Sequence, residues 1–307
     1  MSGPVASDDT IESDGSPPGD EPEVAEAREG EVGGLPILRA LPRRGRRTVG
    51  PWCFVDVLGP AFASEHPMLV GPHPHTGLAT VTWLVEGEVV HRDSLGVEQL
   101  IRPGQVNLMT AGRGVAHAEE SPSAVRSGRL FGVQLWFALP DETRTGPADF
   151  EHHGELPRVT TGGLEVALLV GSLDGVTSPV RADAPAIGAE ITVGGGTGVV
   201  ELDPTFEHLV VVLDGGVGVE GVDLSKGGSV RLAPGRHELV LSGAPSGRAL
   251  LLGGVVRTDP IVMWWNFVAR TRDEIDEAMA EWAARGERFG DVTTSLARID
   301  APPPPWR

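Results

Sequence analysis

HPHTGLATVTWLVEGEVVHRDSLG (residues 73–96) and EQLIRPGQVNLMTAGRGVAHAEE (residues 98–120) are the segments that decide the fold. The first reads as a strand, a Glu-Gly turn, a second strand and another turn. The second reads as three short strands separated by a Pro-Gly turn and a glycine turn. GRLFGVQLWFALP (residues 128–140) adds one more strand. Short strands at such regular spacing are typical of a β-sandwich or a small barrel.

A second set of strands follows between residues 163 and 256. Its VVLDGGVGV turn (residues 211–219) resembles the WLVEGEVVH turn (residues 83–91). In the same way, RLAPGRHELV (residues 231–240) resembles QLIRPGQVNL (residues 99–108). These likenesses predict that one barrel unit has been duplicated. The 42 glycines and 26 prolines also suit an all-β chain with many tight turns.

The two ends of the chain differ from this pattern. Residues 1–31 contain ten acidic residues and one base, and large apolar side chains are scarce there, so we expect disorder. Thr271 and Glu274 have the spacing of a capping box and open an amphipathic pattern that predicts a helix over residues 271–285. The predicted domains are a disordered acidic tail over 1–34, a metal-binding barrel over 35–150, a second barrel with the helix over 151–290, and a proline-rich tail over 291–307.

A cluster of arginines follows the acidic tail, and two interpretations stay open. The cluster is either a docking surface for an anion or for the tail itself, or a solvated edge, which is the commoner fate of charge runs. Its members are Arg39, Arg43, Arg44, Arg46 and Arg47.

The composition excludes several classes of protein. The net charge of −18 argues against direct nucleic-acid binding, because that affinity comes from clustered Lys and Arg. No apolar run approaches the roughly 18–20 residues that span a bilayer. The first residues show no basic segment followed by an apolar run, so we expect no secretory signal. Cys53 is the single cysteine, so an intramolecular disulfide is excluded, which fits a reducing compartment. We expect a cytoplasmic monomer without nucleic-acid or membrane partners.

Two pairs of polar residues carry the candidate chemistry. His73 and His75 are separated by one residue, and so are His117 and Glu119. Residues at i and i+2 on a strand point to the same face, and the inward faces of barrel strands share one cavity. Three imidazoles and one carboxylate could therefore surround one ion at about 2.0–2.2 Å.

A lone His-x-His pair is a weak signal, because imidazole is also an ordinary hydrogen-bonding group, but two such pairs beside turns favour a metal site. Three nitrogens, one oxygen and no thiolate suit Fe(II), Mn, Ni, Cu or Zn, and the residues alone do not choose among them. Four protein ligands leave open positions on an octahedral ion, which is typical of a catalytic or sensing site. His91 is expected beside the site or in a turn, and the second barrel is expected to be metal-free.

Beyond these arguments, the sequence resembles the pirin family of the cupin superfamily. The similarity lies in RTVGPWCFVDVLGP (residues 47–60), in residues 73–96 and 101–120, in GVQLWFALP (residues 132–140) and in NFVARTRDEIDEAM (residues 266–279). It covers about residues 36–290. The resemblance implies a bicupin, that is, two cupin-type barrels.

The resemblance also implies which residues bind the metal. In pirins the N-terminal barrel binds iron, or another divalent ion, through residues that match His73, His75, His117 and Glu119, so Fe(II) is the first expectation. The sequence departs from the common family pattern at three positions that spare these ligands but bear on the polarity of the pocket: Val57, Ala79 and Ala138.

The resemblance leaves two functions open, since some pirins cleave flavonols such as quercetin with O₂ and eukaryotic members act as nuclear co-regulators. One is a metal-dependent dioxygenase of the quercetin 2,3-dioxygenase type, acting on a flavonol-like or other small aromatic substrate, with Glu119 as ligand and base. The other is a non-catalytic regulator that senses metal or redox state and binds a protein partner. A third hypothesis, an ion that only stabilises the barrel, is disfavoured by the open coordination positions.

Overall fold

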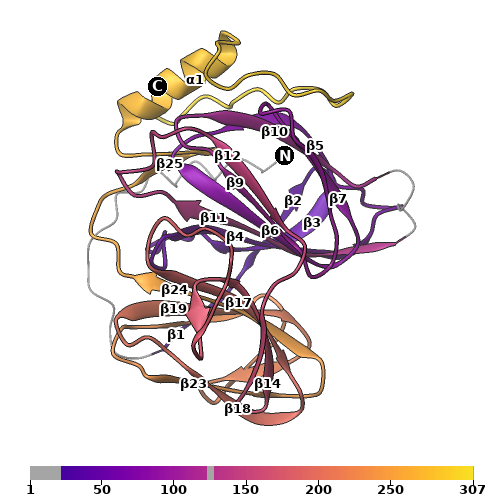
Figure 1. Ribbon diagram of the computed structural model, residues 1–307, viewed down its shortest axis with the longest axis vertical. Helices are drawn as coiled ribbons and strands as arrows, with labels where there is room; N and C mark the ends of the chain where they lie inside the picture. Colours follow the sequence, from indigo (N-terminus) through magenta and orange to yellow (C-terminus); the bar gives the residue numbers. More distant parts are fainter. Residues whose placement is uncertain (1–21, 123–127, 307) are drawn as a thin grey trace.

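The computed structural model describes residues 22–122 and 128–306. The chain forms two β-barrels, each built from a seven-stranded and a four-stranded sheet. Figure 1 shows them as two lobes, with α1 (Arg272–Ala283) on the side of the first barrel that faces away from the second. The predicted all-β fold with two cupin-type barrels and a C-terminal helix is confirmed.

Most of the strands belong to one barrel or the other. The first contains β2 (Arg28–Val32), β3 (Leu35–Leu41), β4 (Trp52–Phe62), β5 (Leu69–His75), β6 (Leu78–Glu86), β7 (Val89–Asp93), β8 (Glu98–Ile101), β9 (Val106–Thr110), β10 (Val115–Glu120), β11 (Arg129–Ala138) and β12 (Asp149–His153). The second contains β1 (Glu23–Glu26), β13 (Arg158–Thr161), β14 (Leu164–Val170), β17 (Ala186–Val193), β18 (Gly196–Glu201), β19 (Phe206–Asp214), β20 (Val217–Val219), β21 (Val222–Leu224), β22 (Gly228–Leu232), β23 (Glu238–Gly243) and β24 (Gly247–Val255). Two further antiparallel pairs are β15 (Ser172–Leu173) with β16 (Val176–Thr177), and β25 (Val262–Trp264) with β26 (Phe267–Ala269).

Both barrels have the same strand order, as the predicted duplication requires. The large sheets run β12-β9-β6-β11-β4-β3-β2 and β1-β22-β19-β24-β17-β14-β13, and the small sheets run β5-β10-β7-β8 and β18-β23-β20-β21. One of the two sequence likenesses is out of register, however. Pro103 and Gly104 precede β9, whereas Pro234 and Gly235 follow β22, the counterpart of β9. Pro-Gly turns are common enough in all-β chains to match in the wrong register.

The two large sheets pack face to face, and this contact explains the long apolar runs in their strands. In β4, Val55 and Val57 face the second barrel and pack in one cluster with Val211 of β19. Phe54 and Leu58, on the opposite face of β4, point into the first barrel and line a cavity there. Because both faces of the strand are buried, the usual alternation of apolar and polar residues is lost.

The predicted disorder of residues 1–34 is wrong for residues 22–34, while residues 1–21 lie outside the described part. β1 pairs with β22, where it occupies the position in the second barrel that β12 occupies in the first. β2 pairs with β3 at the edge of the first barrel. The backbone groups of an open sheet edge need partners, so a strand of low hydrophobicity can be ordered by pairing there.

Ion pairs also fix the start of the chain. Glu23 lies 3.2 Å from Arg43 and 2.8 Å from Arg46, so docking of the tail is confirmed for these two arginines. Arg39 instead donates two hydrogen bonds of 2.8 Å to the carboxylate of Asp56, inside the first barrel.

The C-terminal segment packs on the first barrel. Thr271 accepts a hydrogen bond from the Glu274 N–H, as the predicted capping box requires, and the predicted apolar stripe of α1 is buried. The proline-rich end is also in contact with the barrel, because the Ile299 N–H donates to the Pro72 carbonyl over 2.9 Å. Within the described residues, no helix has the length and apolar character needed to cross a bilayer.

Cys53 is a buried thiol, and we expect it to be unreactive in the folded protein. It packs in a cluster with Phe54 and Trp136, and burial raises its pKa to about 12. Since the thiolate is the reactive form, an aromatic disulfide reagent should label no cysteine under native conditions at pH 8 and one equivalent in denaturant. Rapid labelling of the native protein would contradict this burial.

Candidate metal centre

Two adjacent strands of the first barrel carry the predicted metal ligands. β5 and β10 pair antiparallel, and the register places His117 directly opposite His73 and Val115 opposite His75. The pairing shifts by one residue between His117 and Glu119, which is a β-bulge. Bulges often re-aim a side chain next to a functional site. All four predicted residues are buried, and all four line one cavity.

The three imidazoles lie close enough to share an ion. Their candidate ligand atoms all lie within 4.8 Å of one another, and the Nε2 atoms of His75 and His117 are 3.0 Å apart. Two nitrogens bound to one ion at about 2.1 Å are separated by roughly 3.0–3.4 Å, depending on the angle between them. The spacing of these atoms therefore fits a common ion.

Hydrogen bonds to backbone carbonyls orient two of the rings. His73 Nδ1 lies 2.9 Å from the Gly71 oxygen, and His75 Nδ1 lies 3.2 Å from the Asn266 oxygen. A carbonyl can only accept, so each Nδ1 carries the proton and each Nε2 keeps its lone pair for a metal. Burial lowers the pKa of His73 to about 4 and lowers those of His75 and His117 as well. Neutral imidazoles are the form that binds metals.

Glu119 occupies a different position around the cavity. A carboxylate oxygen of Glu119 lies within 4.8 Å of ring nitrogens of His91 and His117, and these three residues form a second group of possible ligands. His73 and His75 do not belong to this second group. Burial raises the pKa of Glu119, so its charged form gains from a neighbouring cation. Among the described residues, the structure thus brings together three histidines tightly, with the carboxylate beside His117.

A chain of hydrogen bonds extends from His117 to a carboxylate that sequence reasoning missed. His117 Nδ1 lies 3.3 Å from His91 Nδ1, and His91 Nε2 lies 3.0 Å from Asp93 Oδ2. Asp93 is held in place because its Oδ1 accepts the N–H groups of Leu95 and Val97. The acceptor Asp93 fixes the proton on His91 Nε2, so His91 Nδ1 accepts from His117 and leaves His117 Nε2 free.

We expect Asp93→Asn to weaken metal affinity tenfold to about a hundredfold, the usual loss when an outer partner of a ligand is changed. The asparagine oxygen can still accept the N–H groups of the turn, but the asparagine NH₂ group donates towards His91 Nε2. His91 would then carry its proton on Nδ1 and could no longer accept from His117. Competition with a chelating dye would measure the loss. The exposed Asp223→Asn of the second barrel is the matched control, and equal affinities in the two variants would contradict the role of Asp93.

The cavity around these residues is narrow and largely apolar, with a volume of about 30 Å³. The rings of Phe54 and Trp136 stack at 4.0 Å on one side, and Asp56 and Gln134 supply polar atoms. The other members of the lining are apolar: Val32, Leu58, Met68 and Val70.

None of the three departures from the family pattern lines this cavity. Val57 and Ala79 belong to the cluster between the barrels, and Ala138 packs with Cys53. The expected bearing of Val57 and Ala79 on the polarity of the pocket is therefore wrong, since on a strand alternate side chains face opposite sides. Ala138 lies on the same face of β11 as Gln134 and Trp136, which line the cavity, but it is not itself part of the lining.

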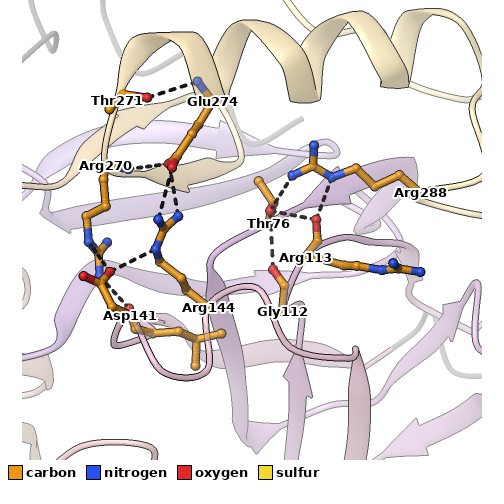
Figure 2. Close-up of polar contacts among 10 residues, drawn as sticks. Thr76, Gly112, Arg113, Asp141, Arg144, Arg270, Thr271, Glu274 and Arg288 are labelled. Carbon is orange, nitrogen blue, oxygen red and sulfur yellow. Dashed lines mark hydrogen bonds and ion pairs between the residues drawn. The ribbon is translucent and has the colours of Figure 1, made fainter.

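The C-terminal segment braces the first barrel at the start of α1 (Figure 2). Arg144 donates to both carboxylate oxygens of Glu274 over 3.1 Å, and the Arg270 N–H donates to the same side chain over 2.8 Å. Arg270 Nε also lies 2.9 Å from a carboxylate oxygen of Asp141. These charged contacts fix the position of the helix on the barrel.

A second brace reaches the metal-site strands themselves (Figure 2). Arg288 donates to the Arg113 carbonyl over 2.6 Å and to Thr76 Oγ1 over 3.2 Å, and Thr76 Oγ1 also donates to the Arg113 carbonyl. Thr76 directly follows His75, and Arg113 lies two residues before β10. The C-terminal segment therefore ties the end of β5 to the start of β10.

The equivalent positions of the second barrel are apolar. The register of β18 with β23 places Val200 opposite Leu239, as His73 lies opposite His117. The four counterparts of the predicted ligands are all buried in the core of the second barrel: Val200, Leu202, Leu239 and Leu241. This explains why one barrel, and not both, carries the histidine cluster.

Fold and site together define a bicupin with a buried histidine cluster in its first barrel. The family model named Pirin matches residues 34–137, and the Pirin C-terminal cupin domain matches residues 191–290. The chain belongs to the pirin family.

Several relatives are similar over most of the chain. A Pseudomonas aeruginosa protein with the provisional name of a quercetin 2,3-dioxygenase is 44% identical over 92% of this chain and 90% of its own. A crystal structure of quercetin 2,3-dioxygenase from Acinetobacter baumannii is 42% identical, with a TM-score of 0.88 over 92% of this chain and 95% of that one. A bacterial pirin of Escherichia coli in complex with nickel(II) shares the fold at 18% identity, with a TM-score of 0.61 over 77% of this chain and all of that one (100%).

Proposed function

We propose that the chain is a metal-dependent dioxygenase of the quercetin 2,3-dioxygenase type, acting on a flavonol-like or other small aromatic substrate. The observation that carries the proposal is the convergence of three imidazoles with free Nε2 atoms in one buried cavity. The names of the similar proteins supply the reaction class. The ligands would be His73, His75, His117 and Glu119, all in the first barrel. Fe(II) is our first choice of ion, and Ni, Mn, Cu and Zn fit the same donors.

The bound ion would supply a Lewis acid for a substrate oxygen and electron exchange with O₂. The chain's own residues would position the substrate. The stacked Phe54 and Trp136 offer an aromatic wall for a flat ring. Glu119, a buried carboxylate beside His117, can accept the proton of a substrate hydroxyl.

The size of the cavity limits how a substrate can bind. About 30 Å³ is roughly the room that two water molecules need, so a whole flavonol does not fit. The reacting edge of the substrate would enter, and the lining would have to move; Met68 is the lining side chain best suited to this, because it is flexible and unbranched. Substrates with one ring should therefore bind more readily than larger ones.

Oxygen uptake by the metal-loaded protein with a panel of flavonols and single-ring phenols tests the proposal. Uptake and ring-opened product that disappear in His117→Ala would support it. A metal-loaded protein that turns over no member of the panel would overturn it.

The narrow cavity also favours a second candidate, a metal- or redox-sensing regulator that binds a protein partner. A regulator needs no room for a substrate beside the ion. It would expose different surfaces with Fe(II) and Fe(III), which hydrogen exchange on β5 and β10 would detect in a protein without turnover.

A further inference from the structure

A second cavity, of about 540 Å³, opens at the mouth of the second barrel. It lies between the starts of β17 and β19 and the end of β18. Its volume falls within the range of about 300–1,000 Å³ that is usual for small-molecule sites. It belongs to the other barrel from the histidine cluster, so a ligand could bind there whether or not the chain is a dioxygenase.

His208 lines this cavity and is more buried than the apolar lining residues Leu173, Ile187 and Leu202. On β19 it alternates with Leu209 and shares its face with Val210 and Val212, which belong to the core of the second barrel. Its side chain is 1% exposed, and neither ring nitrogen has a hydrogen-bond partner among the described residues. The ring lies over Gly253, where a Cβ would come within 2.6 Å of His208 Cδ2, so the glycine makes room for it.

A buried polar group without a partner is costly, so one that faces a cavity is a candidate for ligand binding. Burial lowers the pKa of His208 to about 4, so the ring is neutral near pH 7. A neutral imidazole offers one donor and one acceptor. A hydroxyl group, which also donates and accepts, is the matching ligand group.

The walls and rim restrict the rest of the ligand. Leu173, Ile187 and Phe206 give an apolar wall suited to a ring. The rim is acidic: Asp183 pairs with Arg181 over 2.7 Å, whereas the carboxylate of Glu201 is exposed and makes no ion pair with a described residue. A negative rim repels anions and attracts cations.

We propose that this cavity binds a small organic amine that carries a ring and a hydroxyl group. The hydroxyl would bind His208, the ring would lie along the apolar wall, and the ammonium group would face Glu201 and its acidic neighbours. The site would be independent of the metal.

Calorimetric titration of the full-length protein with tyramine, a phenol that carries an ammonium group, tests this directly. Phenethylamine, which lacks the hydroxyl, should bind about three- to tenfold more weakly, the usual worth of one hydrogen bond. 3-(4-Hydroxyphenyl)propionate, which carries a carboxylate in place of the ammonium group, should not bind. His208→Leu should remove the preference for tyramine over phenethylamine, while the exposed His237→Leu of the same barrel should keep it.

A second measurement does not depend on how a variant folds. In wild-type protein labelled at histidine, tyramine should shift the imidazole NMR signals of His208 and leave those of His73, His75 and His117 in place. Three results would overturn the proposal: no saturable binding up to roughly 10 mM tyramine, an unchanged preference in His208→Leu, or binding that His117→Ala abolishes, which would place tyramine in the first barrel.

Discussion

Replacing His117 with alanine is expected to lower the affinity for a divalent ion by more than about 100-fold, beyond the loss typical of an outer partner. His117 lies between the other two imidazoles and Glu119, with its Nε2 atom 3.0 Å from that of His75. Its removal deletes a ligand and breaks the hydrogen-bond chain that links the site to His91 and Asp93. The metal content after dialysis, and the loss of the thermal stabilisation that the ion gives the wild type, would measure the effect.

Two comparisons make this result specific. His237→Ala, at an exposed position of the second barrel, should bind the ion like the wild type. Glu119→Gln keeps an oxygen that can coordinate, so it should retain more affinity than His117→Ala while losing the group that accepts a proton. One equivalent of metal with wild-type affinity in His117→Ala would refute the histidine site and, with it, the dioxygenase.

The part of the site that the sequence predicts is the part set by local geometry. His73 and His75 share a face because of strand alternation alone, and so do His117 and Glu119. The placement of Asp93 depends instead on β7 pairing with β10, where Asp93 lies opposite His117. A signal for it was present, because His91 and Asp93 form a third pair at i and i+2.

Other supports of the site leave no such signal. The carbonyl of Asn266 orients His75 from 191 residues away, and any residue could supply that oxygen. The carbonyl of Gly71 orients His73 from two residues away, and position 71 itself requires glycine, because a Cβ there would come within 1.9 Å of the Ala297 oxygen. Tertiary contacts through the backbone have no residue signature, so they appear only in the structure.

The start of the chain shows why composition gave a wrong prediction of disorder for residues 22–34. Residues 22–34 are polar and charged, a composition typical of disorder, yet they form β1 and β2. They are ordered because they pair with two open sheet edges and because Glu23 forms ion pairs with Arg43 and Arg46. Composition describes a segment by itself and cannot register the edge that it pairs with.

A pair of truncations separates these two views of the N-terminus. A protein lacking residues 1–33 is expected to be less stable than one lacking residues 1–21 by about 2–5 kcal/mol. Burial of Val32, at 8% exposure, accounts for roughly 1.5–3 kcal/mol of this, and the loss of backbone pairing and of the Glu23 ion pairs adds the rest.

The longer truncation should alter the metal site as well as lower the stability, because Val32 lines the cavity that holds the histidines. Urea unfolding followed by tryptophan fluorescence would give the two free energies, and the shorter truncation is the control because it leaves β1 and β2 intact. Removing β1 and β2 also bares the edges of β22 and β3, so the longer truncation should aggregate more readily. If both proteins unfolded at the same urea concentration with the same slope, β1 and β2 would contribute nothing to the stability of the barrels.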